Sequence, residues 1–297
     1  MSQELKVLGI GEVLWDVFGA EKRLGGAPFN FTYHCHALGA QAAIVSRVGD
    51  DADGAELIEA VAALGVNTHL IQKDPDHHTG RVEVTVGPDG IPSYRCIENV
   101  AWDYIEITPE AEAAAAEADI VGFGTLAQRN EVSWRTIHTL LAKTKHGTLR
   151  VCDVNLRHQY YSPEFLTESL IQSEIVKVNE DEFARLQAIF ELPCDEDAAA
   201  QKIIEEFDLT TLVLTLGPKG ARAWSETERA EVPGLLIRVR DTVGSGDAFI
   251  ATFAMEVARG SSLATALYWA NVAGAYVATQ HGATPPMSWD ILRNFVH

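Results

Sequence analysis

The chain has 297 residues, of which 47% are hydrophobic and 22% are charged, a balance that is typical of a soluble globular protein and not of a disordered one. Its 42 acidic and 23 basic residues give a formal net charge of −19, which repels nucleic acid and anionic membranes, so neither is an expected partner. The four cysteines are widely scattered, the N-terminus is too charged for a signal peptide, and no apolar run reaches the roughly 20 residues that span a bilayer, so we expect a cytoplasmic protein.

Strand-like and helix-like stretches alternate from the N-terminus onward. The first apolar run, 5–11, ends in a glycine, and the helix-like run 29–38 that follows it ends before Gly39. The alternation continues, with strands expected at 42–48, 119–124, 149–154, 175–178, 211–216 and 221–224, and helices at 55–64, 110–117, 132–145, 180–190 and 198–207. This pattern predicts an α/β fold, in which a mostly parallel sheet has helices on both faces and binds ligands beyond the carboxyl ends of its strands.

Two segments depart from this alternation. Residues 79–86 alternate apolar and polar side chains, turn-forming residues follow at 87–90, and a strand pattern resumes at 93–98. This pattern predicts a β-hairpin with one solvent-facing side, which we expect to form an appendage to the buried sheet. A shorter excursion, 12–24, follows the first strand.

The stretch Asp241-Thr242-Val243-Gly244-Ser245-Gly246-Asp247 lies between a strand-like run at 235–239 and an apolar helix at 248–258. The two glycines that flank Ser245 allow successive backbone N–H groups to point into one concavity at a helix N-terminus, where an anion is favoured. Asp247 lies at its edge, where we expect it to be ionised and ready to accept a hydroxyl proton. This combination suits phosphoryl transfer. The alternative is an ordinary glycine-rich turn in which Asp247 caps the helix.

The same stretch resembles the C-terminal signature of the ribokinase family, also called PfkB, in which the last aspartate is the catalytic base. Further stretches resemble other motifs of that family in the same order along the chain: Gly11–Asp16, Leu24–Asn30, Asp153–Arg157, Asn179–Glu182 and Thr215–Gly220. The first of these is most similar to the bacterial fructokinases, and in the third Val154 replaces the usual proline. The chain has no GxxxxGK[ST] motif, and its first strand lacks the third glycine of a dinucleotide-binding fingerprint, which argues against a P-loop kinase and an oxidoreductase.

The resemblance implies a sugar site in the first part of the chain. Asp16 would hold vicinal hydroxyl groups through its two acceptor oxygens, and the motif with Gly25, Gly26 and Asn30 would close as a hinge and contact the sugar. Without the resemblance, Asp16 could be a turn residue and Asn30 a helix cap. The remaining candidate sugar or lid contacts are Tyr94, Arg95, Trp102 and Asn155.

The resemblance also implies a site for ATP. Arg157 would bind phosphate oxygens, although a surface salt bridge is the alternative. Thr215, Gly217 and Gly220 match the nucleotide loop, whose residues could equally form a β-turn. Asn271 matches a position near adenine, and its alternative is a polar helix residue that faces water.

Two cation sites follow from the same motifs. Asn179 and Glu182 lie three residues apart at a helix start, and we expect them to hold Mg²⁺ through water, although they also match a helix capping box. The resemblance adds a monovalent-cation site, which would take K⁺, near Asp241, Thr242 and Gly282.

The resemblance therefore implies a three-layer ribokinase-like α/β fold, with a single kinase domain over residues 1–297 and a small β-sheet lid formed by segments 12–25 and 79–102. Because such lids often pair between subunits, we expect a homodimer. The implied activity is transfer of the γ-phosphoryl group of MgATP to a primary hydroxyl of a ketose, with D-fructose giving fructose 6-phosphate. A 2-keto-3-deoxygluconate kinase, a ribokinase and a non-catalytic sugar-binding relative stay open as alternatives.

Overall fold

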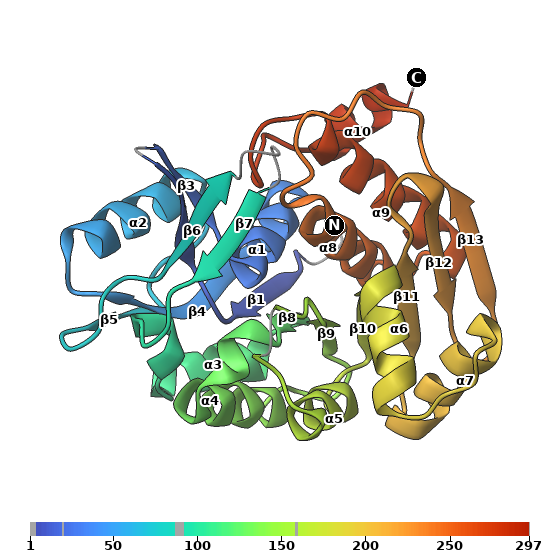
Figure 1. Ribbon diagram of the computed structural model, residues 1–297, viewed down its shortest axis with the longest axis horizontal. Coiled ribbons are helices and arrows are strands. Elements are labelled where there is room, and N and C mark those ends of the chain that lie inside the picture. The colour runs from blue at the N-terminus through green and yellow to red at the C-terminus, as the bar shows by residue number, and fades with distance from the viewer. Residues whose placement is uncertain (1–3, 20, 87–91, 158–159, 297) are drawn as a thin grey trace.

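The computed structural model describes residues 4–19, 21–86, 92–157 and 160–296, with the backbone alone at 84–86 and 92–94. Within these residues the strands form two sheets (Figure 1). The larger sheet has the strand order β13-β12-β11-β10-β9-β8-β1-β4-β5, and the smaller has the order β3-β2-β6-β7.

Parallel pairing joins all neighbours of the larger sheet from β5 to β11, whereas β12 and β13 are antiparallel additions at one edge. The strands of this sheet are β1 (Lys6–Ile10), β4 (Gln41–Gly49), β5 (Ile71–Asp74), β8 (Ile120–Gly124), β9 (Leu149–Asp153), β10 (Ile175–Asn179), β11 (Thr211–Thr215), β12 (Gly220–Trp224) and β13 (Arg229–Pro233). The parallel strands are buried on both faces, which explains why their sequences are nearly continuous apolar runs.

Helices cover both faces of this sheet and make it the middle of three layers. Neighbouring strand residues point to opposite faces, so that Ile120 packs in one apolar cluster and Val121 in another. One face carries α3 (Pro109–Glu117), α4 (Glu131–Ala142), α5 (Pro163–Ile171), α6 (Glu180–Ile189) and α7 (Glu196–Phe207). The other face carries α1 (Ala27–Ala37), α8 (Ser245–Ala258), α9 (Leu263–Ala278) and α10 (Trp289–Phe295). This arrangement confirms the predicted α/β class.

The two segments that broke the predicted alternation pair with each other in the smaller sheet. It consists of β2 (Leu14–Phe18), β3 (Glu21–Gly25), β6 (Arg81–Val86) and β7 (Pro92–Cys96), and β2 runs parallel to β6. One of its faces rests on α2 (Ala52–Ala63), because Trp15 is buried in the cluster that includes Leu57 and donates its Nε1–H to the carbonyl of Asp53.

The predicted strand at 235–239 is wrong. After β13 ends at Pro233, the chain runs in an irregular path, and the side chain of Leu236 is fully exposed, with that of Val239 about half exposed. The segment is held from α9, where Asn271 donates to the carbonyl of Pro233 and the carbonyl of Ala278 accepts from the N–H of Arg240. An apolar run alone therefore did not make a strand here, because the ladder of the sheet had already ended.

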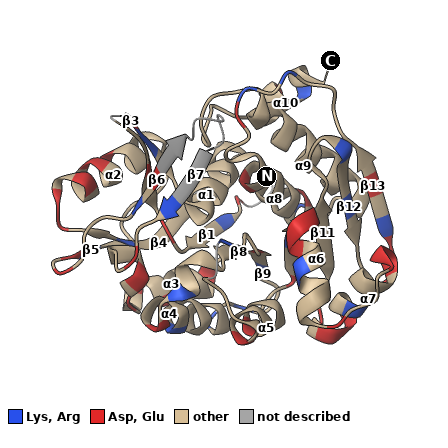
Figure 2. Ribbon diagram, in the orientation of Figure 1, with Lys and Arg blue, Asp and Glu red and all other residues tan. Residues whose placement is uncertain are grey.

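Acidic residues are spread over the outer helices, as at α2 and α6 (Figure 2). In the described part of the chain, no helix is both long and apolar enough to cross a membrane.

Candidate active site

A cavity of about 700 Å³ lies where the carboxyl ends of β1, β9 and β10 meet the N-terminus of α8 and one face of the smaller sheet. Most residues that the sequence motifs single out for sugar, proton transfer and phosphate line this cavity: Asp16, Gly26, Asn30, Asn155, Arg157, Asn179, Glu182, Thr242, Gly244, Gly246 and Asp247. Since these residues come from five separate motifs, the fold and not local sequence brings them together.

Asp247 lies in the first turn of α8, where the Nδ2 group of Asn30 donates a hydrogen bond of 2.7 Å to its Oδ2 atom. The pKa of Asp247 is raised to about 6, first by burial and then by the Asp153 carboxylate, against the opposing effects of Asn30, Lys177 and Arg157. A carboxylate with this pKa is ionised near pH 7 and is basic enough to accept a proton from a hydroxyl group.

The turn before α8 depends on Gly244, whose φ of 78° lies in the left-handed region. A Cβ atom at this position would lie 2.6 Å from the Cα atom and the carbonyl oxygen of Ala283, so glycine alone fits. Gly244 and Gly246 line the cavity, but Ser245 is not among the described residues that line it. The N–H group of Ser245 instead donates to the carbonyl of Thr242 at 3.2 Å. The structure thus places two of the three predicted anion-binding residues at the cavity wall.

Two further carboxyl groups, those of Glu12 and Asp16, line the cavity. Glu12, just after β1, is 2% exposed, and its Oε2 atom has no hydrogen-bond partner among the described residues. Burial raises the pKa of Glu12 to about 7, and burial likewise raises that of Asp16 to about 6. A Cβ atom at Gly25 would overlap the Asp16 carboxylate and one at Gly26 the carbonyl of Glu12, so this pair of glycines lets the chain pass both groups closely.

A buried ion pair lies beneath the turn. Lys177 in β10 and Asp153 in β9 are register partners, and the Nζ atom of Lys177 lies 2.9 Å from Oδ1 and 3.1 Å from Oδ2 of Asp153. Burial by itself would lower the pKa of Lys177, but the carboxylates of Asp153, Glu182 and Asp247 outweigh it and raise the pKa, so the ammonium group stays charged.

Asn179 and Glu182 form the capping box that the sequence allowed as an alternative. The Oδ1 atom of Asn179 accepts from the N–H of Glu182, and Glu182 Oε2 accepts from the N–H of Asn179, both at 2.9 Å. Glu182 Oε1 also accepts from the N–H of Leu156 at 3.1 Å. Each carboxylate oxygen keeps a second lone pair, so the pair fits an ion that is held through water rather than by direct ligation.

Asp241 and Gly282, two of the residues predicted around a monovalent cation, lie together. Asp241 Oδ1 accepts from the N–H of Val243 at 3.0 Å, and Oδ2 accepts from the N–H of Gly282 at 3.2 Å. The guanidinium group of Arg23 lies 3.6 Å from the same Oδ2 atom. The carboxylate fits a cation site, but this arginine already supplies one positive charge beside it.

Apart from Arg157, the residues predicted for the nucleotide lie outside this cavity, toward the β13 edge of the larger sheet. Gly220 pairs with Pro233 across β12 and β13, and Asn271 donates to the carbonyl of Pro233 at 3.0 Å, so Gly220 and Asn271 meet at one place. Gly217 and Gly220 have φ values of 55° and 109°, which explains the two glycines of the turn. Thr215 ends β11 and donates its hydroxyl to the carbonyl of Val178 at 3.3 Å.

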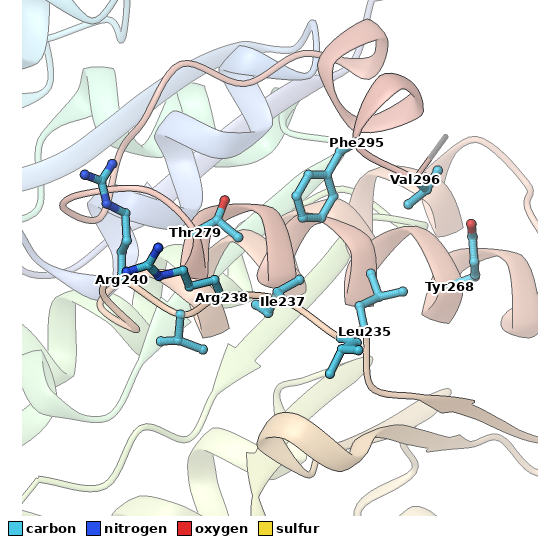
Figure 3. Close-up of a pocket in the computed structure, with 10 residues that line it drawn as sticks. Leu235, Ile237, Arg238, Arg240, Tyr268, Thr279, Phe295 and Val296 are labelled. Atoms are coloured by element: carbon cyan, nitrogen blue, oxygen red, sulfur yellow. The ribbon is translucent and has the colours of Figure 1, made fainter.

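A second hollow, of about 870 Å³, adjoins this edge between the irregular segment 235–240, α9 and α10 (Figure 3). Phe295 and Ile237 point into it, with Tyr268 at one end and Arg238 and Arg240 at the other (Figure 3). None of the residues that the motifs assign to the sugar or the nucleotide lines this hollow.

Trp102, a candidate sugar or lid contact, is not part of the cavity wall, and the side chain of a second candidate lies outside the described part of the chain. Trp102 is 1% exposed in the core, where the guanidinium group of Arg129 stacks 4.0 Å from its ring, so it does not reach the cavity. The side chain of Tyr94 falls outside the described part of the chain, and Arg95 is exposed and paired with Glu83.

Sequence reasoning missed three charged residues that line the cavity: Glu12, Asp153 and Lys177. Glu12 and Asp153 lie inside matched motifs but had no role assigned, and Lys177 is the one charged residue of the strand-like run 175–178. A lysine in a run that must be buried on both faces is a signal of a buried partner, since an unpaired charge there would be costly.

The fold and the cavity together define a class of protein. A parallel α/β sheet presents a glycine turn at a helix N-terminus and a carboxylate of raised pKa at one cavity, a combination that suits an enzyme that transfers phosphoryl groups.

The comparison with known proteins gives the family. The model of the pfkB family carbohydrate kinases matches residues 4–290, so the chain belongs to this family and is a sugar kinase, a phosphotransferase. Fructokinase-2 of Zea mays is 29% identical over 287 residues, covering 91% of this chain and 83% of that protein.

Solved structures of kinases share the fold. An uncharacterized sugar kinase of Pyrococcus horikoshii is 28% identical, with a TM-score of 0.78 over 94% of this chain and 93% of that one. The fructokinase of Xylella fastidiosa with bound ATP is 21% identical, with a TM-score of 0.86 over 98% of both chains. The fructokinase of Vibrio cholerae, solved with fructose, ADP and calcium, is also 21% identical, with a TM-score of 0.81 over 99% of both chains.

Proposed function

We propose that this sugar kinase uses ATP with Mg²⁺ to phosphorylate a primary hydroxyl group of a ketose, and that D-fructose, giving fructose 6-phosphate, is its substrate. The observation that carries the proposal is the convergence of Asp16, Asn30, Asp247 and the Gly244 turn on one cavity. The cavity holds a proton acceptor, an anion-binding turn and hydroxyl-binding carboxylates within the reach of one small molecule.

In this proposal each end of the cavity has its own task. Asp16 and Asn30 would bind and orient the sugar, so that one hydroxyl group faces Asp247. Asp247 would accept the proton of that hydroxyl as its oxygen attacks the γ-phosphorus atom of ATP. The N–H groups around Gly244 and Gly246 would receive the charge that develops on the phosphoryl oxygens.

The phosphate side would be completed by Arg157, which lines the cavity and is exposed at its mouth. Magnesium, when bound, would neutralise phosphate charge, and Asn179 with Glu182 would hold it through water. Asp241, with Gly282 and Thr242, would provide the site for K⁺ if one is used. The adenine would lie near Asn271, beyond Gly217 and Gly220.

The pairing of Arg23 and Arg95 with carboxylates favours a neutral sugar over a sugar acid as the substrate. A 2-keto-3-deoxygluconate kinase would need a free cation for the carboxylate, yet Arg23 is paired with Glu21 and Asp241, and Arg95 with Glu83. Glu12 and Asp16, when ionised, would repel a second carboxylate. Fructose, which carries no carboxylate, is free of that penalty.

We further propose that residues 1–297 form one kinase domain and that the smaller sheet acts as its lid. Leu14, Asp16 and Phe18 of β2 project from that sheet into the cavity, so its position controls access of water to the sugar. Among the described strands its edge strand β7 pairs with β6 alone, and we propose the outer side of β7 as the surface for a homodimer.

ADP release from MgATP, measured by a coupled assay with fructose, ribose, tagatose, 2-keto-3-deoxygluconate and adenosine, tests this function. The proposal predicts that kcat/KM is highest for fructose. A higher value for another sugar would move the substrate assignment but keep the role of Asp247. Binding of fructose without any ADP release would contradict the catalytic role and favour a non-catalytic sugar-binding protein.

A further inference from the structure

The buried pair Lys177–Asp153 has no task in the function proposed above, although it lies at the centre of the cavity wall. The side chains of Lys177 and Asp153 are 8% and 11% exposed, so both are largely withdrawn from water. A buried ion pair is weak evidence for stability, since burial costs each ion its hydration. Its position therefore calls for an explanation other than stability.

The ammonium group of Lys177 lies close to the anion-binding turn. A Cβ atom built at Gly246 would be 3.2 Å from Nζ and 3.8 Å from Cε of Lys177, so this side chain lies beside the turn. Gly246 is the residue before Asp247, and Lys177 lines the same cavity as both. Any side chain at 246 would press on the ammonium group, which gives a second reason for glycine there.

Asp153 and the backbone fix where this charge lies. A lysine ammonium group has three N–H donors. Here Nζ of Lys177 donates to both carboxylate oxygens of Asp153, and these two contacts orient the ammonium group toward the neighbouring strand β9. The next residue, Val154, donates its N–H to the carbonyl of Lys177 at 3.1 Å, which prolongs the pairing of the two strands beyond Asp153. A proline at 154 has no N–H to donate, so the Val154 of this chain ties Lys177 more firmly.

We propose that Lys177, oriented by Asp153, is a positioning residue: its fixed positive charge supports the Gly244–Gly246 turn from below and keeps the neighbouring Asp247 in its ionised form. The inference rests on the proposed role of Asp247 and adds a residue to it. Asp153 serves to hold Lys177 in place, so the two side chains act as a unit.

The charged groups that face Asp247 set what the loss of Lys177 would do. Asp153 from β9 disfavours a charged Asp247, whereas Lys177 from β10 and Arg157 after β9 favour it. Glu12 after β1 also faces Asp247, but its own pKa is about 7, so it is largely neutral at the pH where Asp247 titrates. From α1 the neutral Asn30 adds a hydrogen bond. Without Lys177, the exposed Arg157 would be the remaining cation against the Asp153 carboxylate, so Asp247 would hold its proton to a higher pH.

The substitution Lys177→Met keeps the length of the side chain and removes its charge. We expect kcat to fall at least roughly tenfold, with the KM for the sugar changed by less than about threefold, because a positioned charge acts on the transfer step more than on sugar binding. We also expect the pKa of Asp247, followed by ¹³C NMR of labelled aspartate carboxyl groups and assigned with Asp247→Asn, to rise by about one unit.

The double variant Asp153→Asn/Lys177→Met separates positioning from stability, because it leaves no unpaired buried charge. We expect Lys177→Met alone to lower the melting temperature, because it leaves Asp153 buried without a partner. We expect the double variant to recover the melting temperature, while its kcat stays low. Arg47→Met, which breaks the similarly buried pair of Arg47 with Asp74 away from the cavity, is the matched control and should lower the melting temperature without lowering kcat.

Recovery of kcat together with the melting temperature in the double variant would overturn the inference, as would an unchanged pKa of Asp247 in Lys177→Met. The NMR measurement needs no turnover. A shifted Asp247 pKa in a protein that phosphorylates no sugar would therefore contradict the proposed function and still support the role of Lys177.

Discussion

At the scale of single residues, the cavity keeps three carboxyl groups poised between their neutral and charged forms. Glu12, Asp16 and Asp247 all have pKa values raised by burial, to about 7, 6 and 6. Perturbed carboxyl groups that gather in a cavity are typical of functional sites, since a fold selected for stability alone has no reason to bury them together.

The pH dependence of turnover follows from Asp247. Because a base must be deprotonated and the pKa of Asp247 is about 6, we expect kcat/KM for the sugar to fall as the pH drops through about 6, tenfold for each further unit. The profile is measured from pH 5 to 9 with saturating MgATP. A profile that is flat down to pH 5 would show that Asp247 is not the group that titrates.

Glu12 gives a prediction for stability. Its pKa is about 7 in the folded state and that of an ordinary glutamate in the unfolded state, so the folded state holds the proton more tightly. The stability that Glu12 contributes is thus fully present at low pH and is lost as the pH rises through about 7. We expect Glu12→Gln to stabilise the protein by on the order of 2 kcal/mol at pH 8 and by little at pH 5.

Denaturant unfolding of the wild type and Glu12→Gln at both pH values measures this difference. Comparing two variants cancels the opposite contribution of His34 and His138, whose pKa values burial lowers to about 4 in the folded state. An equal effect of the substitution at pH 5 and pH 8 would contradict the raised pKa of Glu12.

Sequence motifs identified Asp247, Asn30 and Asp16 because each occupies a defined place in a short pattern. The same reasoning missed Lys177, since its meaning depends on its register with Asp153 in a neighbouring strand. The motifs also made Trp102 a candidate sugar or lid contact, whereas its side chain is buried in the core. The guanidinium group of Arg129 stacks on its ring, and a sequence window does not reveal such a long-range contact.

At the scale of elements, the first turn of α6 both caps the helix and carries the carboxylate that we propose for Mg²⁺. Glu182 accepts backbone N–H groups from Asn179 and Leu156, and the same carboxylate is the one proposed to hold Mg²⁺ through water. We expect Glu182→Gln to raise the Mg²⁺ concentration for half-maximal activity by at least about tenfold, because a neutral amide attracts the hydrated ion less strongly.

Ser262→Ala provides the matched control, since it removes the N-cap of α9 far from that ion and should cost about 1 kcal/mol of stability without changing the Mg²⁺ requirement. Titrations of Mg²⁺ at fixed ATP measure both variants. An unchanged Mg²⁺ requirement in Glu182→Gln would reduce Glu182 to a helix cap.

The strands and helices could be predicted from sequence wherever burial decides the pattern. The runs that became β8, β10 and β11 are mostly apolar and almost entirely buried, and they were placed to within a residue or two. Sequence reasoning missed short or edge elements such as β13, whose alternate residues are exposed. It also predicted a strand at 235–239, where the chain is irregular and pairs with no described strand. Hydrogen-bonding partners, which a sequence window does not contain, decided these cases.

At the scale of the whole molecule, the open edge of the smaller sheet leads to a prediction about assembly. The strand β7 is paired with β6 on one side, and we expect its other side to be covered by a second copy of the chain. Light scattering after size exclusion should therefore give twice the chain mass of 32.4 kDa, and hydrogen exchange should show slow amides in β7. A mass of one chain at micromolar concentration would contradict the homodimer.

The central claim is that Asp247 is the base of a sugar kinase, and the most direct test is the turnover of Asp247→Asn with fructose and MgATP. The substituted amide keeps the shape of the side chain and its contact with Asn30 but accepts no proton, so we predict a fall in kcat of at least roughly a hundredfold. Fructose affinity, measured by calorimetry, should change little. Turnover close to that of the wild type would contradict the account.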